Sequence, residues 1–311
     1  MKAALFPGQG SQSVGMAADL YEAHSLARDR FAQASEILGF SLSEVCFNGP
    51  EAALVQTSRA QPALFVHSLI LWELWGAARP RFDFVAGHSL GEFSAVTASG
   101  AIDFESGLRL VQARASAMQI ACDRNPGTMA ALTQLPADKL NDLLAEGGRA
   151  GVVVAANYNS EAQVVVSGLP EAVDHLVKVA GDFGARRAVV LKVGGAFHSP
   201  LMEPAREELK KALDRTTFAR PSCPVVMNVT GTPETDPNAL RTLLEAQIVS
   251  PVKWWQSMQY LGAHQVDWVV EVGSGQVLKG LAKRILTDVE LVTLTTQADF
   301  ERLMAPIQAA P

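Results

Sequence analysis

A serine between two glycines is the first feature of this sequence that could do covalent chemistry. The stretch Gly87-His88-Ser89-Leu90-Gly91 follows the apolar run 82–86 and precedes a helical pattern. At a strand-to-helix corner, small flanking residues let the turn close so that the serine hydroxyl projects alone above the sheet. The helix that follows would direct its N-terminal amides and positive dipole end at an oxyanion. The pattern predicts that Ser89 is a nucleophile; a plain tight turn is the alternative.

A serine hydroxyl needs a neighbouring base before it attacks, and the chain has 6 histidines. His24 and His175 are expected on polar helix faces and His67 in the core. His88 is expected to point away from the serine. His198 lies in a loop at a strand end, where a side chain can be fixed close to another loop. His264 precedes the strand 266–272, at the opposite end from the serine turn. Position therefore favours His198, and an esterase using His264 is the alternative.

Arg114 is the third residue that could do chemistry. It belongs to the helix predicted over 104–122, which Asp103 caps. On a helical wheel, the residues within about 60° of Arg114 are Gly107, Leu110, Val111, Ala117, Met118 and Ala121. An arginine on an apolar stripe needs an anion, because an unpaired guanidinium is costly to desolvate. The partner is either a buried Asp or Glu or the carboxylate of a substrate.

The chain opens as a strand over 2–6, a glycine loop over 7–12 and a helical pattern over 16–34, which is the start of an α/β unit. The loop is not a dinucleotide fingerprint, because Ser13 stands where the third glycine would be needed. It either turns the chain or presents its amides and Gln9 to a ligand. The apolar window 63–78 predicts a buried helix entered through Pro62.

The pattern changes over 128–193. Strands are predicted at 129–132, 152–156, 163–166 and 187–193, with helices at 137–145 and 171–183. This βαββαβ order is that of a ferredoxin-like unit, and both junctions are rich in turn residues. We therefore expect an α/β fold with an α/β-hydrolase-like large domain (1–126 and 195–311) and an inserted ferredoxin-like small domain (127–194). Ligands bind in clefts between such domains.

Composition narrows the class of protein and partner. The net charge of -6 argues against nucleic acid as a partner. The three cysteines, Cys46, Cys122 and Cys223, have no metal-ligand spacing and predict reduced thiols in a cytoplasmic protein without a metal site. No leader is predicted before Pro7, and the longest apolar window falls short of the roughly 20 residues that span a bilayer. We expect a cytoplasmic monomer with no membrane partner.

Six segments in order resemble the malonyl-CoA:acyl carrier protein transacylases. They are Pro7-Gly8-Gln9-Gly10-Ser11-Gln12, Gly87-His88-Ser89-Leu90-Gly91-Glu92, Arg114 with Met118-Gln119, Asn157-Tyr158-Asn159, Gly195-Ala196-Phe197-His198-Ser199-Pro200-Leu201-Met202, and Gln247 before Pro251-Val252. Each motif alone is modest. Together they cover nearly the whole chain.

The resemblance implies a Ser-His dyad that uses no cofactor beyond the coenzyme A thioester. Ser89 would take the malonyl group from coenzyme A and pass it to the phosphopantetheine thiol of acyl carrier protein. His198 would be the base, its tautomer held by a main-chain carbonyl beside the position of Gln247. The amides of Gln9 and Leu90 would form the oxyanion hole.

The resemblance also implies an acyl pocket. Arg114 would pair with the malonyl carboxylate, Met118 and Asn159 would line the pocket, and Phe197 resembles members that select malonyl groups. The candidates for docking an acidic carrier are Arg186, Arg187, Lys279, Lys283 and Arg284. A polyketide rather than fatty acid carrier, and a non-catalytic docking subunit, remain as alternatives.

Overall fold

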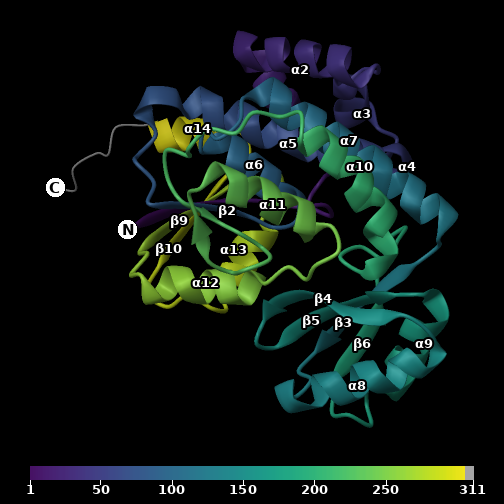
Figure 1. Cartoon of the computed structure of the whole chain (residues 1–311). Coiled ribbons are helices and arrows are strands. Elements are labelled where there is room, and N and C mark those ends of the chain that lie inside the picture. Colours follow the sequence, from purple (N-terminus) through teal and green to yellow (C-terminus); the bar gives the residue numbers. More distant parts are fainter. Residues whose placement is uncertain (305–311) are drawn as a thin grey trace.

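The computed structural model describes residues 1–304, which form two β-sheets with helices around them (Figure 1). The larger sheet has six strands in the order β10-β9-β1-β2-β7-β8. All neighbours are parallel except β7 and β8. Its strands are β1 (Lys2–Phe6), β2 (Phe84–Gly87), β7 (Val225–Val226), β8 (Pro233–Glu234), β9 (Trp268–Val272) and β10 (Glu290–Leu294).

Helices cover both faces of the larger sheet. They are α1 (Ala18–Ala23), α2 (Ser25–Leu38), α3 (Leu42–Asn48), α4 (Glu51–Leu54), α5 (Thr57–Trp75), α6 (Leu90–Ala98), α7 (Phe104–Arg124), α10 (Glu203–Leu213), α11 (Pro237–Gln247), α12 (Trp254–Ala263), α13 (Val277–Ala282) and α14 (Gln297–Met304). In Figure 1, α12 lies on the opposite side of the sheet from α5 and α6.

Alternation along β1 explains this layering. Ala4 and Phe6 pack into the core formed with α5, α6 and α7, whereas Ala3 and Leu5 pack into the core formed with α12 and α13. Successive side chains of a strand point to opposite faces, so a strand covered on both faces is apolar throughout. The run 3–6 has this composition and is fully buried.

The smaller sheet is antiparallel, in the order β4-β5-β3-β6. Its elements are β3 (Thr128–Thr133), α8 (Leu140–Gly147), β4 (Val153–Ser160), β5 (Gln163–Gly168), α9 (Pro170–Val179) and β6 (Arg187–Val190). Leu143 of α8 and Leu176 of α9 pack on one face of the sheet. Its β4 edge meets the segment before α12, where Tyr158 N donates to Val252 O at 2.9 Å.

Some predicted boundaries were wrong. The helix predicted over 16–34 is two helices, because His24 takes extended angles (φ -125°, ψ 132°) and its ring bonds Gln297. The buried helix begins at Thr57, so Pro62 lies inside α5 rather than at its entrance. The strand predicted over 187–193 shortens to β6. Within residues 1–304 no helix has the length and apolarity needed to cross a membrane.

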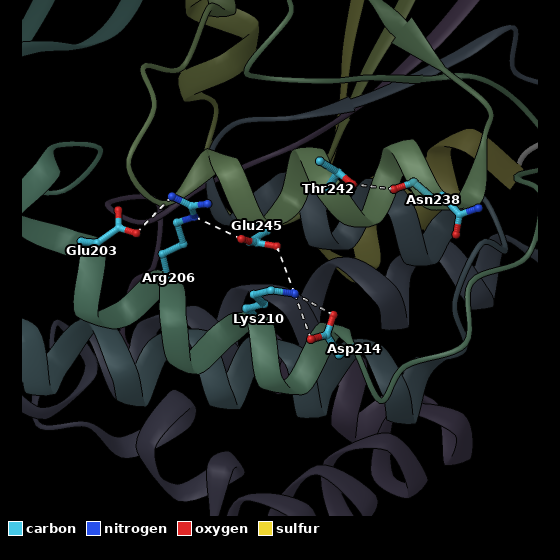
Figure 2. A network of polar contacts seen from close by, with 7 residues as sticks. All are labelled: Glu203, Arg206, Lys210, Asp214, Asn238, Thr242 and Glu245. Carbon is cyan, nitrogen blue, oxygen red and sulfur yellow. Dashed lines mark hydrogen bonds and ion pairs between the residues drawn. The ribbon is translucent and has the colours of Figure 1, made fainter.

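A surface ion network joins α10 to α11 (Figure 2). Glu245 of α11 accepts from Arg206 at 3.1 Å and lies 3.9 Å from Lys210, both on α10. Glu203 of α10 and Asp214, which follows the last residue of α10, pair with the same two cations. Apart from Glu245, the side chains are solvent-exposed, and exposed pairs contribute at most about 1 kcal/mol each. The network therefore adds little to the stability of the fold.

Candidate active site

Ser89 occupies a strained turn between β2 and α6. Its backbone angles are φ 52° and ψ -106°, a conformation that L-residues rarely adopt. The Asn228 side chain holds both sides of the turn, accepting from Ser89 N at 2.8 Å and donating to Gly87 O at 2.7 Å. A Cβ on Gly87 would collide with the backbone of Gly91, which accounts for a glycine there.

His198 lies beside the serine as the sequence predicted. Its Nε2 is 2.8 Å from Ser89 Oγ, and its Nδ1 is 2.9 Å from the main-chain oxygen of Gln247. A carbonyl only accepts, so Nδ1 carries the proton and Nε2 can take one from the hydroxyl. Burial, followed by the charge of Arg114, lowers the pKa of His198 to about 3. The ring is therefore neutral near pH 7, as a base must be.

Arg114 is buried in the site and faces neutral groups. Nη1 donates to Gln61 Oε1 at 2.7 Å, and Nη2 donates to Ser89 Oγ and to Gln247 Oε1, both at 3.0 Å. No ion pair in residues 1–304 includes Arg114, so the structure does not support the alternative of a buried ion pair. Burial lowers its pKa to about 10, which leaves a cation at neutral pH.

A third buried ionisable group, Glu92, lies on α6 beneath the site. It is fully buried and accepts from Asn228 N and from Gln247 Nε2, the latter at 2.6 Å. Burial raises the pKa of this carboxyl to about 8. Gln247 Nε2 also donates to Ser89 O at 2.8 Å. The Gln247 side chain thus connects the acid, the serine turn and the arginine.

These groups face a cavity of about 550 Å³ between the two sheets. The predicted residues that line it are Gln9, Ser89, Arg114, Met118, Asn159, Phe197 and His198. The small sheet supplies Asn157, Asn159, Gln163 and Val165 to the wall. Gln247 and Leu90 are not among the lining residues and lie behind the surface of the cavity, fully buried.

The amides predicted to form an oxyanion hole have no partner inside the described chain. Within residues 1–304, neither the main-chain N–H of Gln9 nor that of Leu90 donates a hydrogen bond. The Gln9 side chain is itself fixed, since its Nε2 donates to Thr57 Oγ1 at 3.3 Å. Unpaired amides beside a nucleophile are the donors that an oxyanion requires.

Known proteins are similar to this chain in both sequence and fold. The acyl transferase domain family matches residues 4–296. The malonyl CoA-acyl carrier protein transacylase of Escherichia coli (strain K12) is 40% identical over 297 residues, covering 94% of each chain. That of Bacillus subtilis (strain 168) is 39% identical over 284 residues, covering 90% of this chain and 89% of the relative. The chain belongs to the malonyl CoA-acyl carrier protein transacylases.

Solved structures of transacylases superpose closely on the chain. The acyl-carrier-protein-S-malonyltransferase of Bartonella henselae has a TM-score of 0.92 at 38% identity over 97% of both chains. A malonyl-transacylase in complex with its type II PKS acyl-carrier protein has a TM-score of 0.93 at 36% identity, covering 97% of this chain and 98% of that one.

Sequence reasoning missed three residues in this transacylase site: Gln61, Glu92 and Asn228. Asn228 could have been found because it follows the neighbouring strand β7, whereas the polar start of α5 gives no signal that distinguishes Gln61. His88 lines the same cavity and its ring bonds Asn159 at 2.9 Å, but within residues 1–304 it makes no hydrogen bond to Ser89, in line with the expectation that it points away from the serine.

His264 lies outside the transacylase site. Its ring stacks on Tyr260 at 3.9 Å, and its Nδ1 bonds the Tyr260 carbonyl at 2.8 Å. It is not among the residues that line the cavity. The esterase alternative, which paired His264 with Ser89, therefore has no geometric support.

Proposed function

We propose that this chain transfers the malonyl group of malonyl-CoA to the phosphopantetheine thiol of acyl carrier protein through an ester on Ser89, supplying fatty acid synthesis. One observation carries the proposal. Ser89 Oγ is 2.8 Å from the base nitrogen of His198 and 3.0 Å from the guanidinium of Arg114. A nucleophile, its base and a cation for a free carboxylate therefore meet at one oxygen atom.

The proposed reaction has two matching halves. His198 takes the Ser89 proton as Oγ attacks the thioester carbon, and the amides of Gln9 and Leu90 receive the oxyanion. Each such donor contributes roughly 3 kcal/mol in other serine enzymes. Collapse breaks the carbon–sulfur bond, and His198 returns the proton to the leaving coenzyme A thiolate. The carrier thiol then repeats the steps in reverse, and Ser89 regains its proton. No cofactor or metal enters this scheme.

Intact-protein mass spectrometry after brief mixing with malonyl-CoA tests the nucleophile. The wild type should gain the mass of one malonyl group, and Ser89→Ala should gain none. His198→Ala should load at least about 100-fold more slowly, because general-base assistance is worth about 10² to 10⁴ in rate. An adduct that persists in Ser89→Ala would contradict the proposal.

The finer architecture belongs to the same proposal. We assign residues 1–126 and 195–304 to an α/β-hydrolase-like catalytic domain and residues 127–194 to a ferredoxin-like small domain; residues 305–311, which the sequence also assigned to the large domain, lie outside the described residues. The serine turn between β2 and α6 supports the first assignment. The strand order β4-β5-β3-β6, with α8 and α9 on one face, supports the second. Limited proteolysis should cut first near the junctions at 126 and 194.

A second candidate function differs from the first only in the carrier protein that receives the acyl group. One solved relative is in complex with the acyl-carrier protein of a type II PKS. A stand-alone acyltransferase for a polyketide synthase would use the same chemistry on another carrier. Comparing kcat/KM for a fatty acid carrier and a polyketide carrier, each in its holo form, decides between them; the preferred carrier should be favoured at least tenfold.

Carrier docking is proposed beside the cavity mouth. Of the basic candidates, Arg186, Arg187 and Arg284 line a second hollow of about 560 Å³, which shares Gln163 with the main cavity. Carriers of this family are acidic, so charge reversal should raise KM for the carrier but not for malonyl-CoA. Arg187→Glu with Arg284→Glu tests this, and an unchanged carrier KM would exclude the hollow.

We also propose that the protein is a cytoplasmic monomer without a membrane or nucleic-acid partner. The three cysteines, which are free thiols in the structure, and the net charge of -6 support it. Light scattering after gel filtration tests the monomer, and a mass of two chains would contradict it.

A further inference from the structure

Arg114 is a buried cation held by uncharged acceptors. Its guanidinium donates to two amide oxygens, those of Gln61 and Gln247, and to the Ser89 hydroxyl. Its exposed fraction is 1%, and no ion pair within residues 1–304 involves it. A buried guanidinium is rare without a carboxylate partner, because a charge taken out of water needs compensation. The question is therefore why the buried guanidinium of Arg114 has only uncharged hydrogen-bond acceptors.

Glu92 is linked to Arg114 through one amide. Glu92 Oε2 accepts from Gln247 Nε2 at 2.6 Å, and Gln247 Oε1 accepts from Arg114 Nη2 at 3.0 Å. Because burial raises the pKa of Glu92 to about 8, this acid is mostly uncharged near pH 7 and does not neutralise the guanidinium. Glu92 therefore orients Gln247 and occupies none of the donors of Arg114.

Gln61 holds the other side of the guanidinium. It is fully buried on α5, and its Nε2 donates to Gln9 Oε1 at 3.4 Å and to Met118 Sδ at 3.6 Å. Oxygen and sulfur acceptors on one side and a donor-only guanidinium on the other fix the direction of the amide. Gln61 Oε1 must therefore face Arg114 Nη1, at 2.7 Å.

We propose that Gln61 is a specificity-determining residue, whose uncharged oxygen positions Arg114 without neutralising it and so leaves the positive charge for the free carboxylate of the acyl group. The inference rests on the proposed function, in which that group is malonyl. A glutamate at position 61 would form a direct ion pair with Arg114. The malonyl carboxylate would then compete with a fixed anion, whereas a neutral acetyl group does not depend on the charge.

Loading of Ser89 from malonyl-CoA and from acetyl-CoA, followed by rapid-quench mass spectrometry over a range of concentrations, tests the proposal with Gln61→Glu. The ratio of kcat/KM for malonyl over acetyl should fall on the order of 100-fold, mainly through a higher KM for malonyl-CoA. Acetyl loading should stay within about threefold of the wild type, which a general loss of structure would not allow.

Gln33→Glu is the matched control. Gln33 lies on α2 and does not line the cavity, and its Oε1 already accepts from Arg30 Nη1 at 2.7 Å, a bond that a glutamate keeps. The variant adds the same charge outside the cavity and without a contact to Arg114. Its malonyl-to-acetyl ratio should stay within about threefold of the wild type.

A second variant decides the case if Gln61→Glu does not fold by circular dichroism. Gln61→Met keeps the volume and removes the acceptor, so the ratio should fall about tenfold as Arg114 loses one holding contact. An unchanged ratio in the folded variant, or equal losses with both thioesters, would overturn the inference alone. A wild type that loads no malonyl group would overturn the proposed function as well.

Discussion

One oxygen atom, Ser89 Oγ, is shared by two groups that would act on different parts of a malonyl thioester. His198 contacts it from the return segment before α10, and Arg114 contacts it from α7. In the proposed reaction, the base takes the proton of the serine that attacks the carbonyl, and the cation pairs with the far carboxylate. Separating the roles in this way lets the base serve any acyl group while the cation selects one class.

Arg114→Ala separates these roles by experiment. Malonyl transfer should fall on the order of 1000-fold, because a carboxylate would enter a buried site with no cation to meet it. Acetyl transfer should fall less than about tenfold, since His198 and the amides remain in place. Steady-state kcat/KM with both thioesters gives the two values. Equal losses for the two substrates would remove Arg114 from the acyl pocket.

At the scale of elements, local patterns predicted which segments form the site but not how they meet. The strand-glycine-serine-helix pattern gave the Ser89 turn, and the apolar stripe gave the burial of Arg114. Both depend on residues close in sequence. Gln61 and Asn228 were missed because their importance lies in contacts with residues 53 and 139 positions away. Helix boundaries such as His24 were wrong where a tertiary contact overrode local propensity.

Gly91→Ala tests whether the serine turn depends on close backbone approach. A Cβ at this position would collide with the carbonyl of Phe6 in β1. We expect the free energy of unfolding in urea to fall by about 2–4 kcal/mol and Ser89 loading to be lost with it. Gly280→Ala in α13 is the control, because its Cβ meets nothing within 4 Å. It should be neutral or stabilising by up to about 1 kcal/mol. Native stability in Gly91→Ala would argue against this packing.

At the scale of the molecule, the cavity exists because the chain leaves the larger sheet after α7 and returns before α10. The intervening sheet brings Asn157 and Asn159 of β4 into the wall of the cavity that Ser89 also lines. Main-chain hydrogen bonds join β4 to Val252, in the segment before α12. No single layer of the fold contains the site. The site therefore forms only when the two sheets pack together, so it is lost when the chain unfolds.

The buried histidine His67 makes the free energy of unfolding of the chain depend on pH. Burial lowers the pKa of His67 in the folded chain to about 4, whereas in the unfolded chain it is about 6.5. Below pH 6.5 the unfolded chain binds a proton that the folded chain excludes, so the free energy of unfolding decreases as the pH falls towards 4. The difference between the two pKa values corresponds to about 3 kcal/mol.

His67→Gln, which keeps a donor for the Thr295 carbonyl, isolates this contribution. Between pH 7.5 and pH 4, urea denaturation should show the wild type losing about 3 kcal/mol more than the variant. The effects of His198 and Glu92 cancel in the comparison, because both proteins contain them. Parallel pH curves for the two proteins would show that His67 is not buried in its neutral form.

The most direct test of the central claim is the fate of the malonyl group on Ser89. Protein loaded with malonyl-CoA and freed of excess substrate is divided among holo carrier protein, apo carrier protein and buffer, and both chains are followed by intact mass. The account predicts that the holo carrier discharges Ser89 at least about 100-fold faster than water or the apo carrier and gains the malonyl mass. Discharge by water as fast as by the holo carrier, or a carrier that gains no malonyl group, would contradict it.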